Sequence, residues 1–428
     1  MTLHHCFSEC ICVPFSDING GVVPRECIHS GADLPEVLRH RRYPEFRACD
    51  DASIAIARAK KANQLGIEKR LSGTYVFCGQ VFGHFGHLIT EYLHRVIVSS
   101  VLSDPSLPIL MFKDEGSPLT AWQSDLLQIC TNRGREIVFY SEPVVVENLL
   151  VFEPLSGLWS APSKSYLQLL SQHPIEPVSV SAADDFTNKI VYLTRSKIWD
   201  GKESPHGHVV LEESIEKELS KLGVSVVSPE KLSINSQLAL FTSAKAIVAP
   251  EGSALHLLEL LGAKACRHLI VLPRQYGERM ALAQFKPRVK KLTYIDCVQC
   301  TRIQWRRGEP CPFSGLALFD FAVLFEALRK ILGLDLPPRE RLRSMHVEGL
   351  EEMQRLSRQW NLLPYSRYHS SICEAGRLLA KDHPELSTSL FAISRNLSPF
   401  SNEYMSLWRQ HATAKRHQII RFKPSKDD

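Results

Sequence analysis

The chain is predicted to be an α/β protein, because short apolar strands alternate with helices along most of its length. The clearest unit is AIVAPEGSALHLLELLG, residues 246–262. An apolar run ends here in a tight Glu251-Gly252-Ser253 turn, and an apolar helical pattern follows. In α/β proteins, a strand, a sharp turn and a helix N-terminus in this order present backbone N–H groups to a phosphate. We therefore expect a ligand at the carboxyl edge of a parallel sheet.

The first part of the chain, residues 1–175, is predicted to be an α/β domain. Its expected strands are 74–78, 108–112, 136–140 and 149–152, and its expected helices are 86–102 and 119–133. Strands that alternate with helices of this length favour βαβ units and a largely parallel sheet. Residues 156–185 are rich in Ser and Pro and are expected to contain the linker to the next domain.

A second α/β domain is predicted for residues 185–305. Its expected strands are 189–194, 224–227, 246–249 and 268–272, and its expected helices are 211–222, 236–243 and 254–261. From residue 312 to residue 428 the pattern becomes helical, which predicts a C-terminal helical extension. In that extension LALFDFAVLFEALRKIL is strongly amphipathic and ends at Gly333, and three shorter helices are expected later.

Composition excludes several classes of protein. Of the chain's 428 residues, 44% are hydrophobic and 23% are charged, which is typical of a soluble globular protein. Its net charge of +5 is too small for a dedicated nucleic-acid binder. No apolar stretch approaches the ~20 residues of a membrane span, and the N-terminus does not read as a signal peptide. The twelve cysteines are scattered, so we expect reduced thiols and a cytoplasmic location.

Two further features of the sequence have ordinary structural interpretations. Cys297, Cys300 and Cys311 form a loose cluster without a convincing fourth ligand, so no metal site is predicted. Residues 286–291 and 305–307 form a basic patch, interpreted as a solvated face that could alternatively meet an anionic polymer or a membrane surface.

The first candidate constellation is GHFGHLITEYLHRV, residues 83–96. His87, Glu91 and Arg95 stand at i, i+4 and i+8, so a continuous α-helix would carry them on one face. Histidine is suited by its ordinary pKa to act as a base at neutral pH. The alternative interpretation is that the three residues brace a domain interface.

The second and third constellations follow predicted strands. Arg195 and Lys197 end the strand in KIVYLTRSK, where they would face the crevice in which α/β sheets bind ligands, unless they form a basic turn in solvent. Gly252 would let a ligand approach the backbone, and Ser253 could cap the helix. A larger set belongs to the same expected nucleotide site: Glu251 on the ribose, His256 as a packing residue or ligand, and Gln237 in the upstream loop.

These motifs, in this order, resemble glycosyltransferase family 61, whose bacterial members include capsular polysaccharide enzymes. His87, Glu91 and Arg95 match the family's N-terminal motif, Arg195 matches its strand-end arginine, and the resemblance covers about residues 75–275. The sequence departs from the family pattern at His208–Glu213, where many members carry an Arg and then an Asn-Glu pair, and at Glu251, where many have His.

The resemblance implies a GT-B architecture, in which two Rossmann-like domains face a cleft. It implies a metal-independent, inverting transfer from a nucleotide-sugar donor to a saccharide or lipid-linked acceptor, at the inner face of a membrane or in the cytoplasm. His87 would be the base, with Glu91 as the other candidate, Arg95 would hold Glu91, and Arg195 with Lys197 would stabilise the leaving diphosphate. The alternative function is a non-catalytic saccharide-binding or assembly protein. Because neither GxxxxGK[ST] nor GxGxxG occurs, a P-loop or dinucleotide enzyme is disfavoured.

Overall fold

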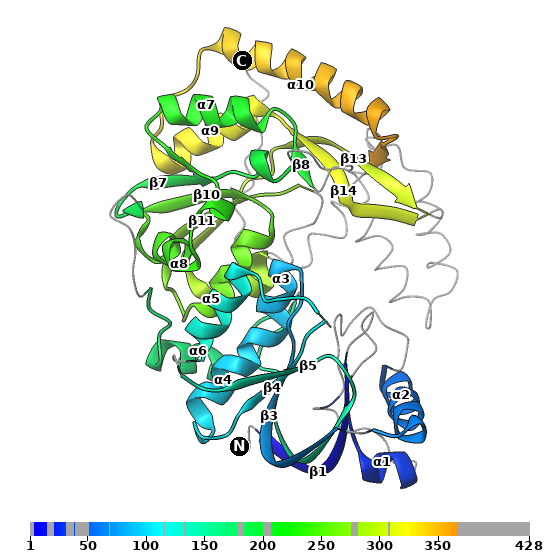
Figure 1. Ribbon diagram of the computed structural model, residues 1–428. Coiled ribbons are helices and arrows are strands. Elements are labelled where there is room, and N and C mark those ends of the chain that lie inside the picture. Colours follow the sequence, from blue (N-terminus) through cyan, green and yellow to red (C-terminus); the bar gives the residue numbers. More distant parts are fainter. Residues whose placement is uncertain are drawn as a thin grey trace, which may run out of the picture.

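The protein stacks two α/β layers, with its N-terminal half below and most of its C-terminal half above in Figure 1. The computed structural model describes residues 4–14, 21–30, 38, 51–67, 69–114, 116–131, 134–158, 160–177, 184–199, 207–274, 281–306 and 309–365. The three short helices expected near the C-terminus lie outside these residues.

The lower sheet has the strand order β2-β1-β6-β3-β4-β5. Its strands are β1 (His4–Val13), β2 (Gly21–Pro24), β3 (Arg70–Gln80), β4 (Ile109–Phe112), β5 (Ile137–Tyr140) and β6 (Val144–Phe152). Strands β6, β3, β4 and β5 run parallel, as predicted, whereas β1 and β2 form an antiparallel edge that the sequence did not reveal. The helical segments of this half are α1 (Arg25–Ser30), α2 (Asp51–Leu65), α3 (Phe85–His87), the π-helix η2 (Leu88–Leu93), α4 (His94–Leu102), α5 (Ala121–Cys130) and α6 (Lys164–Gln172).

The upper sheet is entirely parallel and has the order β12-β11-β10-β7-β9. Its strands are β7 (Ile190–Leu193), β9 (Ser225–Val227), β10 (Ala246–Pro250), β11 (Cys266–Leu272) and β12 (Val289–Tyr294). The helical segments between them are η4 (Ser196–Trp199), α7 (Glu212–Lys221), η5 (Pro229–Lys231), α8 (Ile234–Ser243), η6 (Ser253–Leu260), η7 (Ala281–Phe285) and η8 (Lys286–Arg288). Every residue of β10 is buried, which explains its unbroken apolar run.

A third sheet lies beside the upper one and has the order β15-β13-β14-β8. Its strands are β8 (His208–Val209), β13 (Val298–Arg306), β14 (Glu309–Phe319) and β15 (Leu363–Tyr365), and the helices that follow β14 are α9 (Phe321–Leu332) and α10 (Arg339–Gln359). The helical pattern expected from residue 312 is therefore wrong for its first residues, which belong to β14. Residues 315–319 of this strand are all buried, and a short apolar run of this kind does not distinguish a buried strand from a buried helix by its periodicity; the helix begins only at Phe321.

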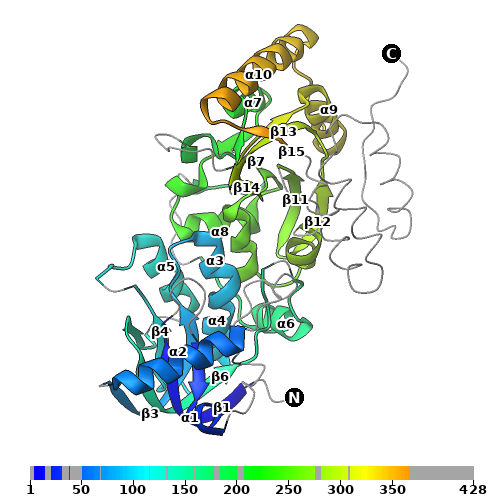
Figure 2. The same ribbon diagram turned by 90° about the vertical axis from the view of Figure 1, so that its right-hand side faces the viewer.

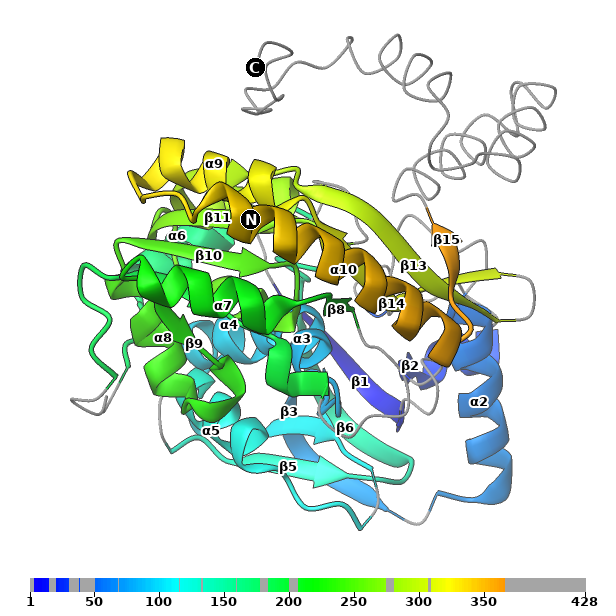
Figure 3. The ribbon, with the colours of Figure 1, turned by 90° about the horizontal axis from the view of Figure 1, so that it is seen from above.

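One hydrophobic core joins the two halves. It contains strand residues of both sheets, such as Val76 and Ile247, together with side chains of α4, α5, α6, α8 and η6. A second cluster packs on the lower sheet around β1 and β6, and a third packs between the upper sheet and the helices α7, α9 and α10. Figures 2 and 3 show these three helices above the upper sheet. Because the inner faces share one core, residues from the two halves meet in the middle of the molecule.

Several helix ends follow the sequence signals closely. Thr120 and Gln123 form a capping box on α5, Ser233 caps α8, and Asp320 caps α9, which ends at the left-handed Gly333. Within residues 156–185, expected to contain a linker, α6 forms and buries Tyr166 and Leu170 in the shared core. Among the described residues, no helix is long and apolar enough to cross a membrane.

Candidate functional site

The site lies at the carboxyl edge of the upper sheet, where three neighbouring parallel strands end. Arg195 follows β7, the Glu251-Gly252 turn follows β10, and Arg274 follows β11. Because parallel strands all end at one edge, segments separated by up to 79 residues of sequence converge there. This convergence confirms that the predicted strand-end motifs share one location, and it adds Arg274.

Gly252 is in close contact with Arg195. A Cβ atom at Gly252 would lie 2.1 Å from Nη1 and 3.0 Å from Cζ of that arginine. The backbone at Gly252 is fully extended, with φ 178°, which any residue can adopt. The requirement for glycine therefore comes from the space that the guanidinium fills, and not from the backbone conformation.

Glu251 and Arg274 form a second, buried contact at this edge. The side chain of Glu251 is buried, and its Oε2 accepts a hydrogen bond from the backbone N–H of Arg274 at 2.9 Å. The Arg274 guanidinium donates to the carbonyl oxygens of Glu251 and Gly207. Arg274 therefore lies next to His208, the position at which family members often carry an arginine. Sequence reasoning missed Arg274, although the Pro273-Arg274 pair ends β11 much as Pro250-Glu251 ends β10.

The charge of Arg274 affects the neighbouring Arg195. Burial, and after it the nearby positive charge of Arg274, lowers the pKa of Arg195 to about 9. Glu212 lies on the other side of Arg195: its Oε1 accepts from the Arg195 backbone N–H at 2.9 Å and from the Tyr192 hydroxyl at 3.0 Å. Burial raises the pKa of Glu212 to about 7. Two guanidinium groups in a poorly solvated place favour an anionic ligand.

The N-terminal half contributes a histidine–carboxylate pair. His87 Nδ1 and Glu91 Oε1 are 2.5 Å apart, with side chains 17% and 5% exposed. The ring of His84 lies 4.6 Å from that of His87, and the ring of Phe82 packs edge-on at 5.6 Å. A carboxylate on Nδ1 fixes the orientation of an imidazole and leaves Nε2 for proton transfer.

Arg95 departs from the predicted arrangement. The expected single helix over 86–102 contains the π-helix η2 at Leu88–Leu93, whose wider turn shifts the residues after it out of α-helical register. Arg95 donates a hydrogen bond to the carbonyl of Phe152 at 2.8 Å, at the end of β6. It therefore braces the helix against the lower sheet, whereas we had predicted that it holds Glu91.

His256 connects the two groups of residues. It lies one short turn after Gly252 in η6, where α3 packs against that segment, and a Cβ atom at Gly86 would lie 2.7 Å from its Cδ2. Burial, together with the neighbouring rings of His87 and His84, lowers the pKa of His256 to about 3, so the ring is neutral at pH 7. The Glu251-Gly252 turn and the His87 pair are therefore neighbours across the junction of the two halves.

The remaining predicted residues have more peripheral positions. Lys197 is exposed and pairs with Glu213 at 2.5 Å, and the Gln237 amide donates to the carbonyl of Leu232 at 3.2 Å, which holds the loop before α8. The expected α-helix after Gly252 is a 3₁₀ segment that starts at Ser253, with Gly252 at the N-cap position and no side-chain cap. The expected capping role of Ser253 is therefore wrong.

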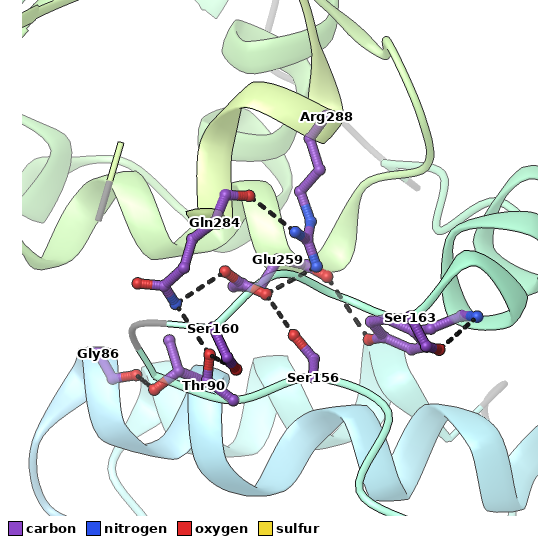
Figure 4. A network of polar contacts seen from close by, with 10 residues as sticks. Gly86, Thr90, Ser156, Ser160, Ser163, Glu259, Gln284 and Arg288 are labelled. Atoms are coloured by element: carbon purple, nitrogen blue, oxygen red, sulfur yellow. Dashed lines mark hydrogen bonds and ion pairs between the residues drawn. The ribbon is translucent and has the colours of Figure 1, made fainter. Parts of the chain in front are cut away.

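A buried polar network fastens the halves together beneath the site (Figure 4). Glu259 of η6 pairs with Arg288 at 2.7 Å and accepts hydrogen bonds from Gln284 at 3.0 Å and from Ser156 at 2.8 Å. Ser156 comes from the N-terminal half, whereas the other three residues come from the C-terminal half. The network fixes η6, and with it His256, relative to the lower layer.

The described part of the chain holds no group of three or more His, Cys, Asp or Glu side chains arranged for a metal ion. In the β13–β14 ladder Cys300 is opposite Leu318, whereas Cys311 is opposite Gln304. The register therefore separates these two cysteines by several residues along the hairpin, instead of placing them together.

Comparison with known proteins adds one finding. Residues 85–266 match the family model described as Glycosyltransferase 61. This range runs from α3 to the start of β11 and includes the His87–Glu91 pair, Arg195 and the Glu251-Gly252 turn, while Arg274 lies just beyond it. No curated protein matches this chain.

Proposed function

From the match of residues 85–266, which makes this chain a member of the glycosyltransferase 61 family and therefore a glycosyltransferase, we propose a reaction. The chain transfers a sugar from a nucleotide-sugar donor, with inversion at the anomeric carbon. The observation that carries the proposal is the meeting of two arginines at one strand edge, Arg274 buried and Arg195 half-buried, with a histidine–carboxylate pair from the opposite half. The two layers would then act as the Rossmann-like domains of a GT-B enzyme.

In this proposal the diphosphate of the donor binds between Arg195 and Arg274. Two guanidinium groups offer charge-assisted hydrogen bonds to phosphate oxygens, and these bonds strengthen as the leaving group gains charge. The positive charge already present from the protein makes a metal ion unnecessary in the proposed reaction. Lys197, which now pairs with Glu213, would assist only from the rim.

Glu251 takes a different role in the proposal from the ribose contact expected at first. Its carboxylate is 1% exposed and engaged by the Arg274 backbone. We therefore assign it to positioning Arg274. Gly252 leaves the space that the Arg195 guanidinium occupies against the turn, which keeps both arginines at the same edge.

The acceptor side is assigned to His87. Its Nε2 removes the proton from an acceptor hydroxyl as that oxygen attacks the anomeric carbon, and the bond from this carbon to the diphosphate oxygen breaks with its electron pair. Glu91 orients the ring through Nδ1 and stabilises the imidazolium that forms. The acceptor would be a saccharide or a lipid-linked glycan in the assembly of capsule or other surface polysaccharide, at the inner face of the membrane.

A panel of nucleotide sugars tests the proposal by donor hydrolysis and by transfer to simple glycan acceptors, read out by mass spectrometry. We expect turnover with at least one donor, loss of donor binding in Arg195→Ala, and retained binding without turnover in His87→Ala. Wild-type turnover in Arg195→Ala would refute the donor site. Unfolding of His87→Ala and Glu91→Gln, followed by thermal denaturation, would instead show that the pair braces the interface.

A further inference from the structure

The opposite edge of the upper sheet carries a concentration of positive charge. The strands β7, β10, β11 and β12 begin there, and exposed cations stand at or beside each beginning. We call this set the basic edge; it consists of Lys189, Lys245, Lys264, Arg267, Lys286, Lys290 and Lys291. The basic stretch at 286–291, read from sequence as a solvated face, is one part of it.

The residues of the basic edge form a continuous surface, as backbone contacts show. The N–H of Lys245 donates to the carbonyl of Lys189 at 2.9 Å, and the N–H of Lys264 donates to the carbonyl of Pro287, next to Lys286, at 3.3 Å. Arg267 Nη1 donates to Asn188, which precedes Lys189, at 2.7 Å. Parallel topology has therefore gathered seven cations from four strand beginnings.

Negative charge is scarce in the same stretches. Residues 184–189, 243–246, 262–267 and 285–291 contain two carboxylates, Asp184 and Asp185. Asp184 accepts a hydrogen bond from Ser236, and Asp185 accepts one from the Thr187 backbone. The one buried cation of these stretches, Arg288, is matched by Glu259. The exposed cations are therefore left in large excess over acids.

Ordinary structural roles account for some of these cations. Lys245 follows the C-terminus of α8, where a cation complements the helix dipole, and Lys290 and Lys291 lie on the edge strand β12, where lysine discourages pairing with another sheet. Neither role explains Arg267 or Lys189, and neither requires acids to be absent. The aromatic residues of these stretches, Phe186 and Phe285, are buried, so no exposed ring is offered to a sugar or a base.

We propose that the basic edge binds the headgroups of an anionic lipid bilayer. A layer of mobile headgroups can match a broad cationic surface whose aromatic residues are buried, whereas a saccharide or nucleic-acid chain is held by stacking and hydrogen bonds to defined groups. The strands point away from the bilayer in this arrangement, so the carboxyl edge with Arg195 and Arg274 faces the aqueous side. The proposal goes beyond the glycosyltransferase reaction and does not depend on its details.

The test measures partition of the full-length protein onto vesicles. Flotation is performed with phosphatidylcholine vesicles, with and without about one third phosphatidylglycerol, at 50 mM and 500 mM salt. The test variant carries Lys245→Gln, Lys264→Gln, Lys286→Gln and Lys290→Gln. The matched control carries Lys60→Gln, Lys61→Gln, Lys217→Gln and Arg343→Gln, four exposed cations away from the edge, so that both variants lose the same net charge.

We expect the wild type and the control to float with the anionic vesicles at low salt and to be released at high salt. The test variant should lose about 600-fold in partition, because each of its four removed cations contributes roughly fivefold close to an anionic surface at low salt. Equal partition of the two variants, or no flotation of the wild type, would overturn the proposal. Binding to a soluble polyanion such as polyglutamate without vesicle binding would also overturn it, and would point to an acidic polymer instead.

Discussion

Substituting Gly252 by alanine tests the central contact of the site, because it should act entirely through Arg195. The new methyl group would lie 2.1 Å from Arg195 Nη1, so the guanidinium must leave its position against the turn. The extended backbone at φ 178° accommodates alanine, and the atoms displaced are the end of a flexible side chain. Stability should therefore change by less than about 1 kcal/mol, since alanine also reduces the entropy of the unfolded chain.

The expected loss is in donor affinity. Charge-assisted hydrogen bonds contribute about 1.5–3 kcal/mol, which corresponds to roughly 10- to 150-fold in the dissociation constant of the donor. Calorimetric titration with the nucleoside diphosphate measures this directly, with the melting temperature as a check on folding. Because Arg195 mediates the effect, Gly252→Ala should cost almost nothing more in an Arg195→Ala background. Additive losses in that double-mutant cycle, or wild-type affinity in Gly252→Ala, would refute the reasoning.

Three further expectations concern groups around the site. Glu91→Gln should lower turnover by at least about tenfold with donor affinity unchanged, because an amide orients His87 without stabilising its imidazolium; equal losses in kcat and in donor affinity would contradict this. Burial raises the pKa of Glu212 from 4.5 to about 7. As pH rises, the carboxyl group of Glu212 therefore loses its proton in the unfolded chain before it does so in the folded protein. The free energy of unfolding of the ligand-free protein should fall by up to about 3 kcal/mol between pH 4.5 and pH 7. Urea denaturation across that range should show a shallower fall in Glu212→Gln, and identical slopes would contradict the assignment. Arg288→Met should destabilise the protein by about 3–5 kcal/mol, because it leaves the Glu259 carboxylate buried without its ion pair. An unchanged midpoint of urea denaturation would show that the network does not fasten the two halves.

The sequence alone determined the α/β class and most of the parallel strands, because runs such as β4 and β10 are apolar throughout and stop at turn residues. It also determined three of the site's components: the His87–Glu91 spacing, Arg195 at the end of β7, and the Glu251-Gly252 turn. These signals are local, since each lies within a few residues of a strand end or within one helical turn.

Tertiary structure decided which of these residues touch and what they do. Arg274 had no local signal beyond its place after β11, and only the adjacency of β10 and β11 brings it to Glu251. A 3.6-residue helical period predicts that Arg95 lies on the same helix face as His87 and Glu91. The π-helix before Arg95 changes that face, and Arg95 contacts the carbonyl of Phe152 instead. The contact between Gly252 and Arg195 joins residues 57 positions apart. Periodicity describes one element at a time, whereas these contacts depend on how separate elements pack.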